Sequence, residues 1–134
     1  MSTVEFHHGM PDKLAYACRL LRKAYRTGAR VVVTGDAAAL KSLDHQLWTF
    51  EMCAFVPHVL AQSEGSVPTR QHDTPIWLTT DPATAPGERS VLVNIGQTVP
   101  VACERFARLF EIVSNDAFDR QQGRLRWKTY TAKG

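Results

Sequence analysis

The chain has no long hydrophobic run. Among its 134 residues, no stretch approaches the roughly 20 consecutive apolar residues that a membrane-spanning helix requires. Its N-terminus has no basic region followed by an apolar run, so the sequence shows no secretory signal. We therefore expect a cytoplasmic protein without membrane contact, folded as one domain over residues 1–134.

Cysteine is scarce. The three copies, Cys18, Cys53 and Cys103, are odd in number, widely spaced and set among apolar neighbours. This pattern is typical of reduced, buried thiols in a cytosolic protein rather than of a disulfide framework.

Signatures of catalysis and cofactor binding are also missing. The five histidines do not stand at metal-ligand spacing from one another, from a cysteine or from a carboxylate, and there is no Gly-x-Ser-x-Gly elbow. The turn at Gly35-Asp36 lies where an α/β sheet can bind an anion, but it has neither the dinucleotide fingerprint nor the lysine of a phosphate loop. We interpret it as a tight turn with a helix cap, and expect no enzyme, metal or cofactor.

What the sequence does contain is an alternation of strand-like and helix-like segments. β-Branched or alternating runs predict strands at 3–7, 30–34, 76–79 and 91–95. Apolar residues at helical spacing predict helices from Pro11 to Gly28, after Asp36 and from Pro100 to about Ala107. Residues 109–114 suit either a helix extension or a last buried strand, and we favour the strand. This order predicts βαβ units and a parallel sheet.

The whole net charge of +3 lies in the last twenty residues. Residues 1–114 contain eleven basic and eleven acidic side chains, whereas residues 115–134 contain five basic and two acidic ones. A basic C-terminal segment predicts an anionic partner, either nucleic acid or an acidic peptide.

The same segment predicts a helix over about 116–131. Phe118 and Leu125 are seven residues apart, so we expect them to share the face that docks on the core. Arg120, Arg124 and Trp127 then fall roughly 180–240° around the helix from Phe118. A tryptophan facing solvent between two arginines is typical of a binding surface.

A second apolar cluster follows the segment Leu43-Asp-His-Gln-Leu-Trp48. Trp48, Phe55, Val56 and Pro57 lie at or beyond the end of a predicted helix. They suit either a plug for one end of the sheet or a docking patch for another protein. His58 fits a structural role or a hydrogen-bonding place at the rim of that patch.

At these residues the chain resembles the chi subunit of bacterial DNA polymerase III holoenzyme. The matching stretches are Gly28-Ala-Arg-Val-Val-Val33, Leu43-Asp-His-Gln-Leu-Trp48, Phe55-Val-Pro-His-Val-Leu60 and Arg126-Trp-Lys-x-Tyr130. The resemblance covers most of the chain. It implies a three-layer α/β/α Rossmann-like domain with a mainly parallel sheet and no nucleotide site. It also implies a non-catalytic accessory of the clamp loader.

The resemblance further implies a partner for the basic helix, the acidic C-terminal tail of single-stranded-DNA-binding protein, which ends in carboxylates and a phenylalanine. The residues that it assigns to this tail are Val113, Arg120, Arg124, Trp127 and Lys128. Better-known members carry Tyr at the position of Trp127 and Lys at that of Arg120. DNA is then contacted only indirectly.

The second cluster corresponds to the surface that binds the psi subunit in the family, and a DinG-like helicase competes for an overlapping surface in some bacteria. The residues assigned to it are Trp48, Phe55, Val56, Pro57 and His58. An alternative function is direct binding of single-stranded DNA by the basic, aromatic helix, because stacking and phosphate contacts require similar residues.

Overall fold

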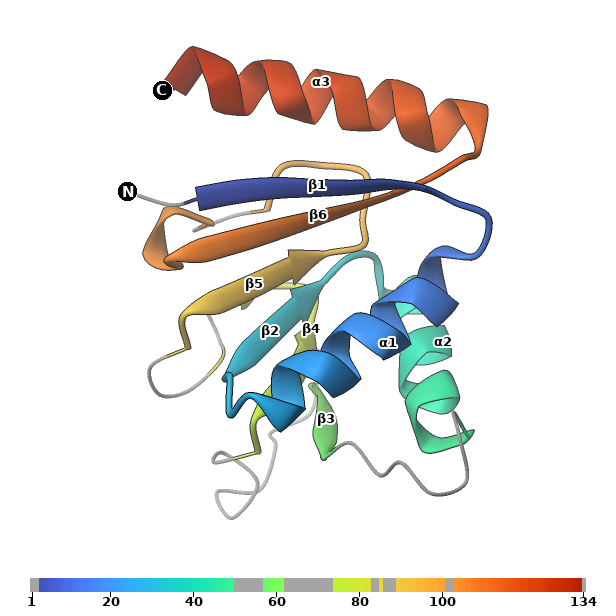
Figure 1. The fold of residues 1–134 in the computed structure, drawn as a ribbon, viewed down its shortest axis with the longest axis vertical. Helices are drawn as coiled ribbons and strands as arrows, with labels where there is room; N and C mark the ends of the chain where they lie inside the picture. Colours follow the sequence, from blue (N-terminus) through green and yellow to red (C-terminus); the bar gives the residue numbers. More distant parts are fainter. Residues whose placement is uncertain are drawn as a thin grey trace.

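The computed structural model describes residues 3–49, 57–61, 74–82, 85, 89–100 and 103–133. Six strands form one sheet in the order β1-β6-β5-β2-β4-β3, and every pairing is parallel (Figure 1). The strands are β1 (Thr3–Met10), β2 (Val31–Thr34), β3 (His58–Ala61), β4 (Ile76–Thr79), β5 (Val91–Asn94) and β6 (Arg108–Ser114). The helices are α1 (Lys13–Arg26), α2 (Ala37–Thr49), α3 (Ala117–Lys133) and the short 3-10 helix η3 (Cys103–Arg105).

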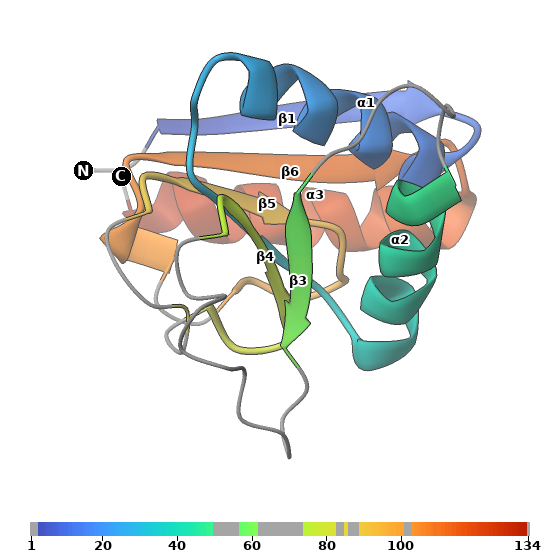
Figure 2. The same cartoon turned by 90° about the horizontal axis from the view of Figure 1, so that it is seen from below.

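Helices cover both faces of the sheet. Val31 and Val33 of β2 pack in a core with α1 and α2, whereas Val32 between them packs with Phe106 and, at its edge, Tyr130 of α3. Successive side chains of a strand point to opposite faces, so α3 lies on the face opposite α1 and α2. In Figure 2, β6 passes between α1 and α3. The expected three-layer α/β/α architecture is confirmed.

The central strands are buried along their whole length. All four residues of β2, β4 and β5 are buried, as expected for parallel strands covered on both faces. The first strand in the sequence, β1, pairs with the last, β6, with Val4 opposite Leu109 and His8 opposite Val113. This pairing brings the two ends of the chain together along one edge of the sheet.

Residues 109–114 form most of β6, so the preferred strand interpretation is confirmed. The helix expected from Pro100 to about Ala107 is wrong. Where that segment is described, it contains only η3, and Arg108 already pairs with Val91 in the sheet. The 3-10 turn instead brings Cys103 and Phe106, which are three residues apart, together against the core beside Val32. The strand β3 was not anticipated, because its His58 start follows a run without clear alternation.

The turn after β2 is a helix cap, as expected. The Ala39 N–H donates to Asp36 Oδ1 at 2.7 Å, which satisfies one of the free donors at the start of α2. Gly35 also packs against the segment after β5: a Cβ on Gly96 would lie 3.0 Å from the Gly35 Cα. Backbone therefore fills part of the carboxyl edge, where nucleotide-binding sheets hold their ligand.

Two cysteines are described, and neither forms a disulfide: Cys18 is buried and Cys103 is half-buried. Burial raises the pKa of Cys18 to about 11, so its thiol stays protonated and unreactive at neutral pH. Cys53 lies outside the described residues. No helix in the described part of the chain is long and apolar enough to cross a membrane.

Candidate functional site

Helix α3 docks on the sheet through polar residues, which corrects the sequence prediction. Phe118 and Leu125 do not face the core; their exposed fractions are 59% and 51%. The inward stripe instead contains Asp119, Gly123, Arg126 and Tyr130. Their spacing of four, three and four residues places them on one face of a helix.

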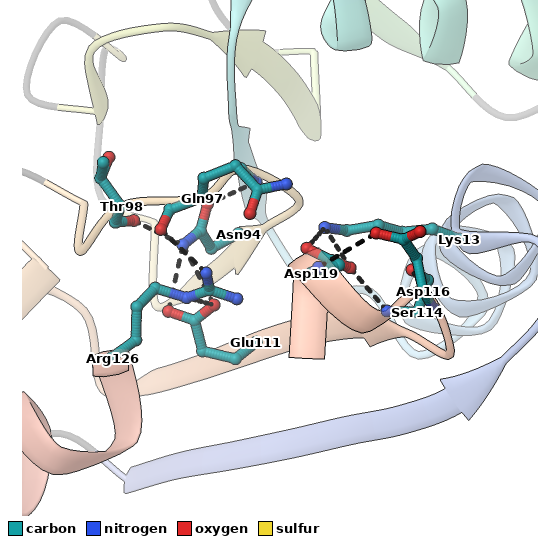
Figure 3. A network of polar contacts seen from close by, with 10 residues as sticks. Lys13, Asn94, Gln97, Thr98, Glu111, Ser114, Asp116, Asp119 and Arg126 are labelled. Atoms are coloured by element: carbon teal, nitrogen blue, oxygen red, sulfur yellow. Dashed lines mark hydrogen bonds and ion pairs between the residues drawn. The ribbon is translucent and has the colours of Figure 1, made fainter. Parts of the chain in front are cut away.

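The sheet dictates this rotation because β6 presents a buried carboxylate to the helix. Glu111 is fully buried, and Arg126 Nε donates to its Oε1 at 2.9 Å. The Tyr130 hydroxyl donates to Oε2, and Asn94 Nδ2 lies 3.0 Å from both carboxylate oxygens. Arg126 also donates to the Gln97 carbonyl at 3.0 Å (Figure 3). A rotation of α3 that turned Phe118 and Leu125 inward would take Arg126 and Tyr130 away from Glu111.

Burial dominates the electrostatics of this network. It raises the pKa of Glu111, although Arg126 and the hydrogen bonds from Tyr130 and Asn94 oppose the shift. Burial, with the neighbouring Glu111 charge, also raises the pKa of Tyr130. The tyrosine therefore keeps its proton and remains a donor. A buried charge of this kind destabilises the fold strongly when its partner is removed.

A second polar contact holds the first turn of α3. Lys13 Nζ of α1 lies 3.1 Å from both oxygens of Asp119, and the Ser114 N–H donates to Asp119 Oδ2 at 2.7 Å. Burial alone would raise the pKa of Asp119, but the Ser114 N–H and Lys13 outweigh it, and the pKa lies below its ordinary value. Figure 3 shows both anchors, so the helix is held at two points about two turns apart.

Between these anchors, α3 touches β6 closely. A Cβ on Gly123 would lie 2.9 Å from Val113 Cγ2. A glycine inside a helix costs about 1 kcal/mol relative to alanine, and here it allows the helix backbone to rest directly on the strand.

This close approach forms the floor of a pocket of about 350 Å³. It is called the tail pocket below, after the peptide that the sequence resemblance assigns to its residues. Its lining residues are Phe6, His8, Val113, Arg120, Gly123, Arg124 and Trp127. Four of the five residues assigned to the acidic tail thus lie together. Lys128 is exposed on α3 and does not line this pocket.

The tail pocket combines a buried floor with exposed walls. Val113 is buried, whereas Arg120 and Arg124 are exposed and the exposed fraction of Trp127 is 54%. The expected tryptophan between two arginines is present. The prediction that Phe118 and Leu125 face the core on the opposite side of the helix was wrong. The tryptophan and the two arginines lie on the flank of α3, about 100° from the inward stripe. That flank faces β1.

Three lining residues were not anticipated. Phe6 and His8 come from β1, and only the pairing of β1 with β6 brings them to this site. Gly123 carried a readable signal, because a glycine within a helical pattern indicates close packing or function.

The second candidate site lies at the end of α2. Trp48 is exposed at 58%, and its ring centroid lies 4.7 Å from that of His58. His58 Nε2 lies 3.1 Å from Asp44 Oδ1. Asp44 and Trp48 are four residues apart on one face of α2, so the Leu43–Trp48 motif and β3 meet at this point.

The remaining residues assigned to this site are partly described. Pro57 is half-buried, and Phe55 and Val56 lie outside the described residues. His58 was considered either structural or a rim residue. Its side chain has no exposed area, which favours the structural role: it supports Trp48 from beneath.

The fold and these sites define a class of protein: a small three-layer α/β/α domain that offers exposed aromatic and arginine side chains on its last helix. The chain belongs to the chi subunit family of DNA polymerase III. The family model "DNA polymerase III chi subunit, HolC" matches residues 1–134, which confirms the resemblance found in the sequence motifs.

Two curated relatives are similar over most of their length. The chain is 32% identical to DNA polymerase III subunit chi of Pseudomonas aeruginosa over 123 residues, covering 91% of this chain and 81% of the relative. It is 29% identical to the corresponding subunit of Haemophilus influenzae over 120 residues, covering 88% and 79%. Chi is a non-catalytic accessory subunit, so this chain serves DNA replication as part of the DNA polymerase III holoenzyme.

Proposed function

We propose that this chi subunit binds the acidic C-terminal tail of single-stranded-DNA-binding protein in the tail pocket, and links it to the clamp loader through a psi subunit. The observation that carries this proposal is the convergence of Arg120, Arg124 and Trp127 over the buried floor at Val113. Such an adaptor acts in the cytoplasm with the replication machinery.

The chemistry of the pocket matches a peptide that ends in phenylalanine. Its terminal carboxylate accepts charge-assisted hydrogen bonds from Arg120 or Arg124, and arginine can make two such bonds at once. Its ring packs between Trp127 and Val113. With Phe6 and Gly123 completing the apolar lining, the pocket accepts a ring and a charge side by side.

This contact is short and near the surface. An affinity of order micromolar, or about −8 kcal/mol, suits a peptide that uses one pocket. Because Arg120 and Arg124 are exposed, added salt should weaken binding by screening the charges.

Trp48 and Pro57 are proposed to contact the second partner, the psi subunit or a DinG-like helicase, together with Phe55 and Val56. Large exposed aromatic side chains contribute much of the energy of protein interfaces. Trp48 suits that role, because its ring packs on His58, which in turn contacts Asp44, while more than half of Trp48 faces solvent.

Direct binding of single-stranded DNA by α3 is the second candidate. It is favoured by one observation: Arg120, Arg124, Trp127 and Lys128 are all exposed on this helix. Base stacking on an aromatic side chain and phosphate contacts would use the same residues. Among its described lining residues the tail pocket has one exposed large aromatic side chain, Trp127, because the exposed Phe118 does not line it, so the site is a small platform for a strand.

A three-way titration separates these functions. The chain is titrated with labelled tail peptide, with the same peptide lacking its terminal phenylalanine, and with single-stranded DNA alone. We expect micromolar binding to the complete peptide and a loss of at least about tenfold without the ring, equal to about 1.4 kcal/mol. Tight binding to bare DNA combined with indifference to the peptide would refute the adaptor function.

A further inference from the structure

One large cavity lies away from both sites discussed above. It has a volume of about 640 Å³ and is lined by the start of β2, the segment before β5 and the segment from η3 to β6. In a parallel sheet these are the amino ends of the strands, whereas the tail pocket lies towards the carboxyl ends of β1 and β6. The two cavities share no lining residue.

Three arginines line this cavity, which we call the arginine pocket: Arg30, Arg89 and Arg105. Among its described lining residues there is no carboxylate. Three guanidinium groups around one cavity repel one another, and an anion between them relieves that repulsion. The described lining of the pocket is therefore positively charged, which suits an anion.

The arginines differ in how they are held. Arg89 is buried, donates to the Pro75 carbonyl at 2.8 Å and lies over the ring of Trp77. It is thus fixed in position before any ligand arrives. Arg105 is exposed and forms no ion pair with a described residue.

Arg30 is the third arginine of the pocket. It is half-buried, and its Nε is a buried donor without a hydrogen-bond acceptor among the described residues. A buried donor without a partner costs about 1–3 kcal/mol.

The other walls are apolar. Val32 and Phe106 are buried, and Pro82, Ala85 and Ala107 also face the cavity. A volume of this size falls in the range of small-molecule sites, which combine apolar walls with a few fixed polar groups. The ligand should therefore carry a flat or apolar body next to its charge.

We propose that the arginine pocket binds a phosphate monoester carried on a ring system, either a free nucleotide or the phosphorylated end of a DNA strand. A phosphate monoester offers three oxygens in a tetrahedral arrangement to several guanidinium groups, each of which can bind two of them. A carboxylate offers only two oxygens in one plane. The apolar walls then contact the nucleoside.

The experiment follows backbone amide shifts of the full chain by NMR during titration. The probes are thymidine monophosphate, thymidine, inorganic phosphate, and oligothymidylate with and without a 5′-phosphate. Ala29 and Ala107 report on the arginine pocket and Gly123 reports on the tail pocket. We expect saturable shifts at Ala29 and Ala107 with thymidine monophosphate below about 10 mM, and none with thymidine.

The two oligonucleotides distinguish the source of the phosphate. Stronger binding of the 5′-phosphorylated strand than of thymidine monophosphate indicates a DNA end, and the reverse order indicates a free nucleotide. Either order supports the pocket, provided that the unphosphorylated strand leaves Ala29 and Ala107 unshifted.

Two variants with equal loss of charge provide the decisive comparison. Arg105→Ala should weaken thymidine monophosphate binding by at least about tenfold, because a hydrogen bond to a charged group is lost. Arg120→Ala, which removes an exposed arginine of the tail pocket, should leave that binding unchanged. Arg105 is exposed, so its removal should not unfold the chain.

Three results would overturn the proposal. They are the absence of saturable shifts at Ala29 and Ala107, shifts confined to Gly123, and equal weakening by both variants. The first result leaves the binding of the acidic tail unaffected, because the two cavities share no lining residue. Shifts confined to Gly123 would mean that the nucleotide binds in the tail pocket instead.

Discussion

Gly123 of α3 rests on Val113 of β6 so closely that no side chain fits between them: a Cβ on the glycine would lie 2.9 Å from Val113 Cγ2. This contact connects the fold with the proposed function. It seats the helix on the sheet, and it places a buried apolar floor beneath two exposed arginines and a tryptophan.

Gly123→Val should therefore damage both stability and tail binding. Its branched side chain must displace Val113 or lift α3, and overpacking of this kind costs about 1–3 kcal/mol. Gly123→Ala is the matched control, because its gain of about 1 kcal/mol in helix propensity offsets much of the smaller displacement. Urea denaturation and peptide titration check both variants. Parent-like stability and peptide binding in both variants would show that the contact is loose.

Arg126→Ala should be far more destabilising than Arg124→Ala, although the two residues are only two positions apart. Removing Arg126 leaves Glu111 buried without its counter-charge, which costs about 3–5 kcal/mol. Arg124 is exposed, and its removal should change the free energy of unfolding by less than about 0.5 kcal/mol. Denaturation of both variants tests this contrast. Similar stabilities would mean that the buried network contributes little.

The pH dependence of Arg126→Ala follows from the same pair. Arg126 lowers the pKa of Glu111, against the effect of burial, so the variant should raise that pKa further. At low pH the carboxyl group is protonated and needs no counter-charge. The stability deficit of the variant should therefore be larger near pH 7 than near pH 4, and a deficit that does not change with pH would contradict this explanation.

The lowered pKa of Asp119 predicts that the folded chain loses stability in acid. Its pKa in the folded chain lies below the ordinary value of 3.8. An acid with a depressed folded pKa stabilises the fold above its unfolded pKa, and that contribution disappears as the pH falls through the folded pKa. Asp119→Asn should reduce the acid-dependent part of unfolding below about pH 4. Denaturation curves of both proteins across that range provide the test.

Trp48→Ala should abolish binding of the second partner and leave binding of the acidic tail intact. Its ring is more than half exposed and packs on the buried His58, so interface area is lost while the core remains. Co-purification with a psi subunit and titration with the tail peptide measure the two effects. Loss of both activities together would indicate unfolding rather than a separate docking surface.

Much of the fold could be predicted from local patterns. The β-branched run Val31–Thr34 and the leucine spacing of α2 identify their elements without information from elsewhere in the chain. The helix expected after Pro100 was wrong, because a 3-10 turn packs Cys103 and Phe106 against the core before β6 begins. Contacts with residues that are distant in the sequence do not appear in the local pattern of hydrophobic residues.

The rotation of α3 at the candidate site also could not be predicted from the local sequence. Hydrophobicity suggested that Phe118 and Leu125 face inward, but a buried Glu111 selects Arg126 and Tyr130 instead. That choice depends on a partner fifteen or more residues away. Likewise, Phe6 and His8 reach the tail pocket only through the pairing of β1 with β6. The arginines were identifiable because the net positive charge is concentrated in the last twenty residues. The exposure of Trp127 was predicted correctly, but from an inward face that proved wrong.

The most direct measurement of the proposed function compares tail-peptide binding by Trp127→Ala and Leu125→Ala. Both remove a large apolar side chain that is about half exposed on α3, but only Trp127 lines the tail pocket. We predict that Trp127→Ala weakens binding by roughly 1–3 kcal/mol while its melting behaviour stays close to that of the parent. Leu125→Ala should bind as the parent does. Equal binding by both variants, or a loss confined to Leu125→Ala, would contradict the assignment of the tail to this pocket.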